Sequence, residues 1–124
     1  MVYLDTHLVV WLYAGFLDYL PSKVAHLIEE NDLYVSPIVL LELQYLKDAK
    51  KITKSPADIL SSLQKEINLK VCEKNFHAVI EESLNVHWTR DSFDRITVAH
   101  ASLNGNKLIT KDKTMRAHYK QAVW

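Results

Sequence analysis

The sequence predicts an α/β sandwich in which a mostly parallel central sheet of four or five strands is flanked by helices. Short apolar runs alternate with amphipathic segments along the whole chain, and residues typical of turns and helix caps separate them. Strands that alternate with helices usually pair in parallel. The chain has 124 residues, 48% of them hydrophobic, with only two glycines and three prolines. We therefore expect a single domain over residues 1–124.

The first third of the chain predicts two strands with two helices between them. Val2-Tyr3-Leu4 reads as a short buried strand that ends at Asp5, and Thr6 is placed to cap the helix that follows. Pro21 and Ser22 open a second helix, and residues 33–35 form the second strand. Asp5 therefore stands at a junction between a strand and a helix.

The middle of the chain predicts two helices and a third strand. Ser36-Pro37 begins a strongly apolar helix that runs through Leu46. Ser55-Pro56, with Asp58 three residues beyond the serine, is a helix start of the capping-box type. That helix continues to about Ile67, and residues 69–72 form the third strand.

The last part adds three helices and two strands. Asn75 caps the first of these helices, and Gly105 provides a left-handed stop for the second. We expect helices over 76–84, from Asp91 or Ser92 to about Asn104, and from Asp112 onward, and strands over 107–110 and 122–124.

Composition limits the function. The lone Cys72 excludes an internal disulfide and a cysteine-rich zinc site. Neither a signal peptide nor an apolar run of about 20 residues is visible, so we expect a cytoplasmic protein without membrane contact. Fifteen basic and fifteen acidic residues give zero net charge, which argues against nucleic-acid binding by bulk charge alone. Basic residues do cluster over 47–54 and 107–120.

Several carboxylates are candidates for a site. Asp5 and Asp112 follow the first and fourth strands, at the edge of the sheet where ligands of α/β proteins bind. Asp5, Asp91 and Asp112 are each explained equally well as helix N-caps. Glu42 is different, because its neighbours one helical turn away on either side are apolar. A buried carboxylate must be protonated, paired with a cation or bound to a metal.

Taken together, these carboxylates indicate a metal site. Asp5, Glu42, Asp94 and Asp112 at one edge of the sheet would repel one another by about 4 kcal/mol per close pair at an effective dielectric constant of about 20. A divalent cation would relieve this repulsion. Oxygen ligands suit Mg²⁺ or Mn²⁺, and no HxH, HxxxH or CxxC spacing favours zinc. Such sites commonly hydrolyse phosphodiesters. The histidines other than His7 read as surface or partly buried helix residues, and the tryptophans as core.

Four segments in this order and spacing resemble the PIN-domain ribonucleases of the VapC toxin type: YLDTHLVVWL, SPIVLLEL, RDSFDRITVAHA and LITKD. The resemblance covers essentially the whole chain and implies a three-layer PIN-like sandwich. The acidic positions of the family fall on Asp5, Glu42, Asp94 and Asp112, which would be both the catalytic residues and the metal ligands. Thr110 and Asp91 would be accessory residues, and Arg95, Thr6 and Lys111 would contact the substrate.

The resemblance also implies an activity and partners. It implies Mg²⁺ as the cofactor, with Mn²⁺ as a substitute, and endonucleolytic hydrolysis of single-stranded or loop RNA. It implies a homodimer and a small antitoxin, as in a type II toxin–antitoxin pair. Exposed parts of residues 8–16 and 38–46 are the candidate antitoxin contacts.

Three other functions remain open from the sequence. A PIN-like module without catalysis would bind RNA or protein, although the intact acidic set argues against it. A DNA nuclease fits the same carboxylates, because no residue that reads the 2′-hydroxyl can be identified. A phosphoacceptor receiver domain fits poorly, because Asp5 is followed by Thr6 and His7 instead of completing an acidic pair.

Overall fold

The computed structural model describes all residues, 1–124, and contains five strands, seven α-helices and one turn of 3₁₀ helix. The strands are β1 (Val2–Leu4), β2 (Leu33–Val35), β3 (Lys70–Val71), β4 (Lys107–Ile109) and β5 (Ala122–Val123). The helices are α1 (Thr6–Ala14), η1 (Leu17–Tyr19), α2 (Ser22–Glu30), α3 (Ile38–Asp48), α4 (Pro56–Ile67), α5 (Phe76–Ser83), α6 (Ser92–Ser102) and α7 (Lys113–His118).

The five strands form one sheet in the order β3-β2-β1-β4-β5, and every neighbouring pair is parallel. The first strand is therefore the central one. Tyr3 pairs with Tyr34 on one side and with Leu108 on the other. The chain adds β2 and β3 on one side of β1, then crosses to add β4 and β5 on the other. Loops diverge at such a switch point, which leaves a crevice beyond the carboxyl ends of the strands.

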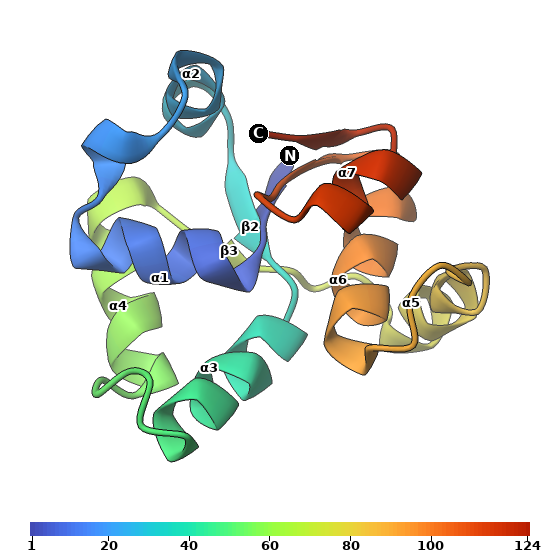
Figure 1. The fold of residues 1–124 in the computed structure, drawn as a ribbon, viewed down its shortest axis with the longest axis horizontal. Coiled ribbons are helices and arrows are strands. Elements are labelled where there is room, and N and C mark those ends of the chain that lie inside the picture. Colours follow the sequence, from blue (N-terminus) through green and yellow to red (C-terminus); the bar gives the residue numbers. More distant parts are fainter.

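Helices cover both faces of the sheet, so the fold has three layers (Figure 1). Side chains alternate along β1: Val2 and Leu4 pack into the larger core with α1 to α4, whereas Tyr3 packs into a smaller core on the opposite face. Val98 of α6 and Met115 of α7 belong to that smaller core. Alternation along one short, fully buried strand thus separates the two helical layers.

The predicted α/β class is confirmed, with corrections at the ends of elements. The sheet is parallel throughout instead of mostly so, and the 122–124 segment does contain a strand. Asp5, not Thr6, is the N-cap of α1. Helix α6 ends at Ser102, two residues earlier than expected. The sequence patterns also missed η1, because a single 3₁₀ turn is too short to show a hydrophobic period.

None of the helices combines the length and the apolar character that a membrane span needs.

Candidate functional site

The ends of β1 and β4 are joined through a carboxylate. Asp5 is only 6% exposed. Its Oδ1 accepts a hydrogen bond from the Thr6 backbone N–H at 2.8 Å, and its Oδ2 accepts one from the Thr110 hydroxyl at 2.7 Å. The Asp5 backbone N–H also donates to the Ile109 carbonyl at 3.1 Å. Both carboxylate oxygens of Asp5 are therefore held in fixed positions at the centre of the sheet edge.

Asp112 lies on the same edge, at the start of α7. Its Oδ1 accepts a hydrogen bond from the Met115 backbone N–H at 2.8 Å, so it is a helix cap as one of the two sequence readings predicted. Its own N–H donates to the Thr110 hydroxyl at 3.0 Å. Thr110 thus connects Asp5 and Asp112 through one hydroxyl. The second carboxylate oxygen of Asp112 has no hydrogen bond within the protein, so capping leaves it available for a ligand.

Glu42 reaches the site from α3. Its Oε1 accepts a hydrogen bond from the Thr6 hydroxyl, and Thr6 itself is 1% exposed. Burial raises the pKa of Glu42; the Thr6 hydrogen bond and the charge of His7 oppose the rise, and the nearby charges of Asp5 and Asp91 add to it. Glu42 is therefore a half-buried carboxyl group that is costly to ionise, as its place on an apolar helix face predicts.

Asp94 is the most perturbed of the acidic residues. Its pKa is raised to about 7, most strongly by burial and then by the neighbouring carboxylates of Asp91, Asp5, Asp112 and Glu42 in that order. Its carboxyl group makes no hydrogen bond within the protein. All three of the other predicted ligands thus act electrostatically on Asp94. A carboxyl group with a pKa near 7 is about half protonated at neutral pH, which relieves part of the repulsion without a cation.

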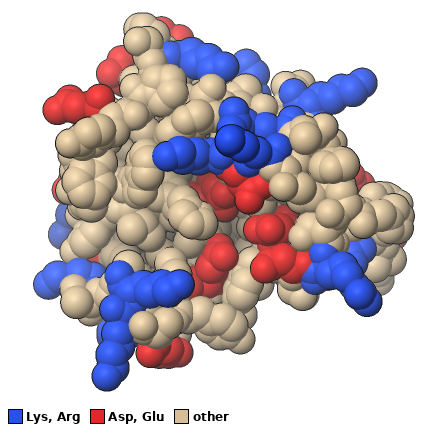
Figure 2. Space-filling model, viewed as in Figure 1, with Lys and Arg blue, Asp and Glu red and all other residues tan.

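Acidic side chains gather at the centre of the face on which α1, α3, α6 and α7 converge (Figure 2). No three acidic, histidine or cysteine side chains are arranged there as a complete metal site. The other carboxylates are close enough to Asp94 to raise its pKa, but they are not arranged to share an ion as they stand. Their chemistry fits Mg²⁺ or Mn²⁺: the donors are all oxygens, and Glu42, Asp94 and Asp112 each keep at least one oxygen without a hydrogen bond.

Asp91 and Arg95, both expected near the site, point to different partners. Asp91 is exposed and caps α6, accepting a hydrogen bond from the Asp94 N–H at 3.0 Å. The intrahelical ion pair between Asp91 and Arg95, which four-residue spacing allows, is not formed. Arg95 Nη2 instead donates to the Ser83 carbonyl at the end of α5, at 3.2 Å. Arg95 therefore fastens α6 to α5, and its contact with RNA stays a prediction.

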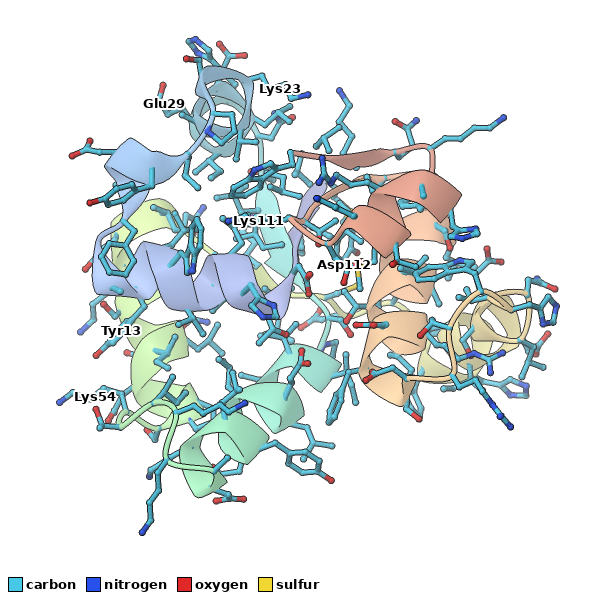
Figure 3. All side chains as sticks on the ribbon, viewed as in Figure 1. Tyr13, Lys23, Glu29, Lys54, Lys111 and Asp112 are labelled. Atoms are coloured by element: carbon cyan, nitrogen blue, oxygen red, sulfur yellow. The ribbon has the colours of Figure 1, made fainter.

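Thr6 and Lys111, the other two predicted substrate contacts, differ in exposure. The Thr6 hydroxyl is buried and engaged by Glu42, so Thr6 positions that carboxyl group. Lys111 is exposed and directly precedes Asp112 (Figure 3). Its Nζ lies 4.9 Å from the centre of the Trp11 ring. RNA contacts by either residue remain predictions.

Ser36 and His100 form a buried pair that the sequence did not predict. The Ser36 Oγ and His100 Nδ1 are 2.8 Å apart, and both residues are at most 1% exposed. Burial lowers the pKa of His100, so the ring is neutral at neutral pH. His100 is therefore a core residue, not a surface or partly buried one as expected. The pair fastens the end of β2 to α6, the helix that carries Asp94, and a single histidine in a helix gives no sequence signal of this.

The fold and the site together define a class: a parallel α/β sheet with interacting carboxylates at its switch point. The family model of the PIN domain matches residues 2–121. The chain therefore belongs to the PIN domain family. No curated protein matches the sequence closely enough to count as a relative.

A solved structure has a similar fold. The crystal structure of VapBC2 from Rickettsia felis, bound to a DNA fragment from their promoter, contains a chain that superposes with a TM-score of 0.68. The two chains are 20% identical, and the alignment covers 99% of this chain and 96% of the other. At this identity the similarity concerns the fold.

Proposed function

We propose that this chain is a Mg²⁺-dependent endoribonuclease of the VapC toxin type, with Asp5, Glu42, Asp94 and Asp112 as its catalytic and metal-binding residues. The observation that carries the proposal is the electrostatic coupling of Asp94 to all three of the other carboxylates. Perturbed acidic groups in a crevice are typical of functional sites. Membership of the PIN domain family and the VapBC2-like fold support the same function.

The protein's own residues prepare the site in two ways. Thr6 and Thr110 hold the Asp5 carboxylate, so it needs little reorganisation to bind a ligand. Asp94 offers two oxygens that have no other partner. When bound, Mg²⁺ would neutralise the carboxylates and stabilise the negative charge that develops on the phosphate in the transition state. Mn²⁺ would substitute, because it accepts the same oxygen ligands.

The proposal extends to partners. The substrate is single-stranded or loop RNA, and the regulator is a small antitoxin that covers the acidic site. Phe16, Leu41 and Tyr45 are exposed apolar side chains of 45–55% relative exposure within or next to the segments expected to meet the antitoxin. A homodimer belongs to the same proposal, as does a cytoplasmic location.

Cleavage by the purified chain tests the proposal. We expect RNA to be cut in Mg²⁺ or Mn²⁺, protected by a chelator, and left intact by the Asp94→Asn and Glu42→Gln variants. Mg²⁺ should also raise the Tm of the wild-type protein more than that of Asp94→Asn, because only the wild type carries the full set of ligands. Equal stabilisation of both proteins would contradict the ligand assignment.

Matched DNA and RNA strands separate the alternatives. Faster cleavage of DNA would identify a DNA nuclease with the same site. Metal-dependent stabilisation without cleavage of either strand would favour a module that binds without catalysis. Catalysis of RNA cleavage by Asp94→Asn at the wild-type rate would reject the site itself.

A further inference from the structure

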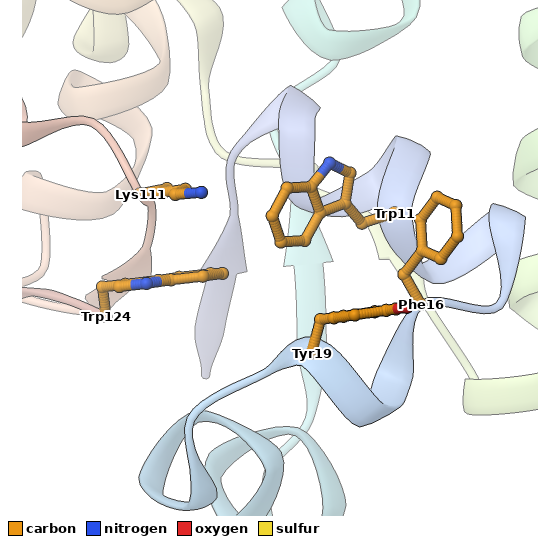
Figure 4. Close-up of a pocket in the computed structure, with 5 residues that line it drawn as sticks. All are labelled: Trp11, Phe16, Tyr19, Lys111 and Trp124. Atoms are coloured by element: carbon orange, nitrogen blue, oxygen red, sulfur yellow. The ribbon is translucent and has the colours of Figure 1, made fainter.

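An open aromatic pocket lies beside the acidic site. Trp11 of α1, Phe16 and Tyr19 of the segment that follows, Lys111 and Trp124 line a cavity of about 540 Å³ (Figure 4). Four of these five residues are aromatic. The sequence suggested that the tryptophans pack in the core, but Trp11 is only partly buried and presents its ring to this cavity. The pocket is therefore lined mostly by aromatic rings.

The packing of the aromatic rings leaves part of their surface uncovered. Trp11 meets Trp124 edge to face, with centroids 5.8 Å apart, and Phe16 meets Tyr19 in the same way at 5.7 Å. Figure 4 shows Trp11 between Trp124 on one side and Phe16 on the other, with Tyr19 below it. Tyr19 is 73% exposed. Tyr19 therefore contributes little to the core, whereas Trp124 also packs against the larger core. Edge-to-face pairs leave part of their flat surface open to a planar ligand.

The pocket continues toward the carboxylates. A smaller cavity shares Trp11, Lys111 and Trp124 with it and is also lined by His7 and Leu8. His7 lies near enough to Glu42 for its charge to act on that carboxyl group. On the other side, Lys111 directly precedes Asp112. A chain that occupies the acidic site can therefore extend into the pocket.

Charge and shape together select the occupant. Lys111 is the only charged residue that lines the pocket, and its Nζ lies at the Trp11 ring. Planar apolar surface beside one positive charge matches a nucleobase next to its phosphate. An apolar peptide side chain would use the rings but would leave Lys111 without a role. The acidic site repels phosphates, so a cation at its rim is where a nucleotide strand needs one.

We propose that this aromatic pocket, defined by Trp11, Phe16, Tyr19, Lys111 and Trp124, is a subsite for one unpaired nucleobase of the RNA strand. The base stacks on the aromatic rings, and Lys111 binds an adjacent phosphate. This inference rests on the proposed ribonuclease function and assigns a substrate contact to it. Stacking accepts any base, so the subsite favours unpaired strands over particular sequences.

Two probes separate base from backbone recognition. Binding of a fluorescent single-stranded oligouridylate is compared with binding of an abasic ribose-phosphate chain of the same length, in a chelator so that nothing is cut. The ratio of the two affinities measures what the bases contribute. It should fall about fivefold or more in Tyr19→Ala and in Trp124→Leu. Tyr19 is so exposed that its replacement should not disturb folding.

Matched controls complete the test. Phe76→Ala removes a 64% exposed aromatic residue on α5, outside the pocket, and should leave the ratio unchanged. Lys111→Ala should weaken the binding of both the oligouridylate and the abasic chain. It should also lower the salt dependence of binding by about one phosphate contact. If Tyr19→Ala and Trp124→Leu both keep the wild-type ratio, the subsite is rejected, and an apolar peptide side chain becomes the better occupant. If the wild type cleaves no RNA in Mg²⁺, the proposed function itself fails.

Discussion

The Thr110 hydroxyl donates a hydrogen bond to Asp5 Oδ2 at 2.7 Å, across 105 positions of sequence. The same hydroxyl accepts a hydrogen bond from the Asp112 N–H. One small side chain therefore fixes two of the four proposed ligands relative to each other. Thr110 is fully buried at the end of β4, so no water replaces it when it is removed.

Thr110→Val keeps the shape of the side chain but removes both hydrogen bonds. We expect a loss of about 1–3 kcal/mol in the free energy of unfolding, because a buried carboxylate oxygen and a backbone N–H lose their partner. Cleavage should also slow, since the Asp5 side chain is then held only through the Thr6 N–H. Urea denaturation and cleavage rates measure the two effects. Thr110→Ser is the control, because it keeps the hydroxyl, and it should retain most of the stability and most of the cleavage rate. A Thr110→Val protein as stable as wild type would contradict this role of Thr110.

Asp94 should make the metal-free protein less stable as the pH rises. The folded-state pKa of about 7 lies above the usual value of 3.8, so the folded state holds a proton that the unfolded state has lost. The stabilisation is complete below about pH 4 and is lost as the pH rises through 7. Asp94→Asn should therefore be more stable than wild type above pH 7, by about 1–2 kcal/mol after allowance for solvent screening.

Thermal unfolding in a chelator, from pH 4 to pH 8, measures this difference. The difference in Tm between Asp94→Asn and wild type should disappear toward low pH, where both side chains are neutral. At high pH, Mg²⁺ should make the wild type the more stable of the two proteins. A gap that does not change with pH would mean that Asp94 does not carry the repulsion.

Asp112 can be tested for its two roles separately. Asn caps helices as well as Asp does, whereas Ala does not. Asp112→Asn should therefore keep the bond to the Met115 N–H and leave stability nearly unchanged, while Asp112→Ala should cost about 0.5–2 kcal/mol. Both should lose RNA cleavage, because both remove a charge from the site. If Asp112→Asn cleaves normally, Asp112 is a cap and nothing more.

Arg95→Met tests the contact between α6 and α5. The substitution keeps much of the apolar stem but frees the Ser83 carbonyl, so we expect a loss of about 1 kcal/mol in stability. If Arg95 also contacts RNA, the KM should rise beyond what partial unfolding explains. Asp91→Asn is a suitable comparison, since it retains the cap of α6. Equal effects of the two substitutions on stability would argue against the contact with Ser83.

The sequence predicted the four carboxylates of the proposed site but not how each is held. Alternating strands and helices sufficed to place Asp5 and Asp112 at one edge, and the apolar neighbours of Glu42 marked it as unusual. The Thr110 and Ser36–His100 contacts join residues far apart in the chain, and no local period reports such contacts. The aromatic pocket was hidden for the same reason, since Trp11 and Trp124 meet only after β5 has joined the sheet.

The central position of β1 has a consequence for biosynthesis. One edge of β1 pairs with β2 early, but its other edge pairs with β4, which is made more than 100 residues later. A growing chain therefore carries an unpaired edge on its most buried strand until residues 107–109 leave the ribosome, and it is prone to aggregate in that interval. Until then Asp5 also lacks Thr110 and Asp112. A chain that has not yet reached residue 112 consequently lacks part of the proposed site.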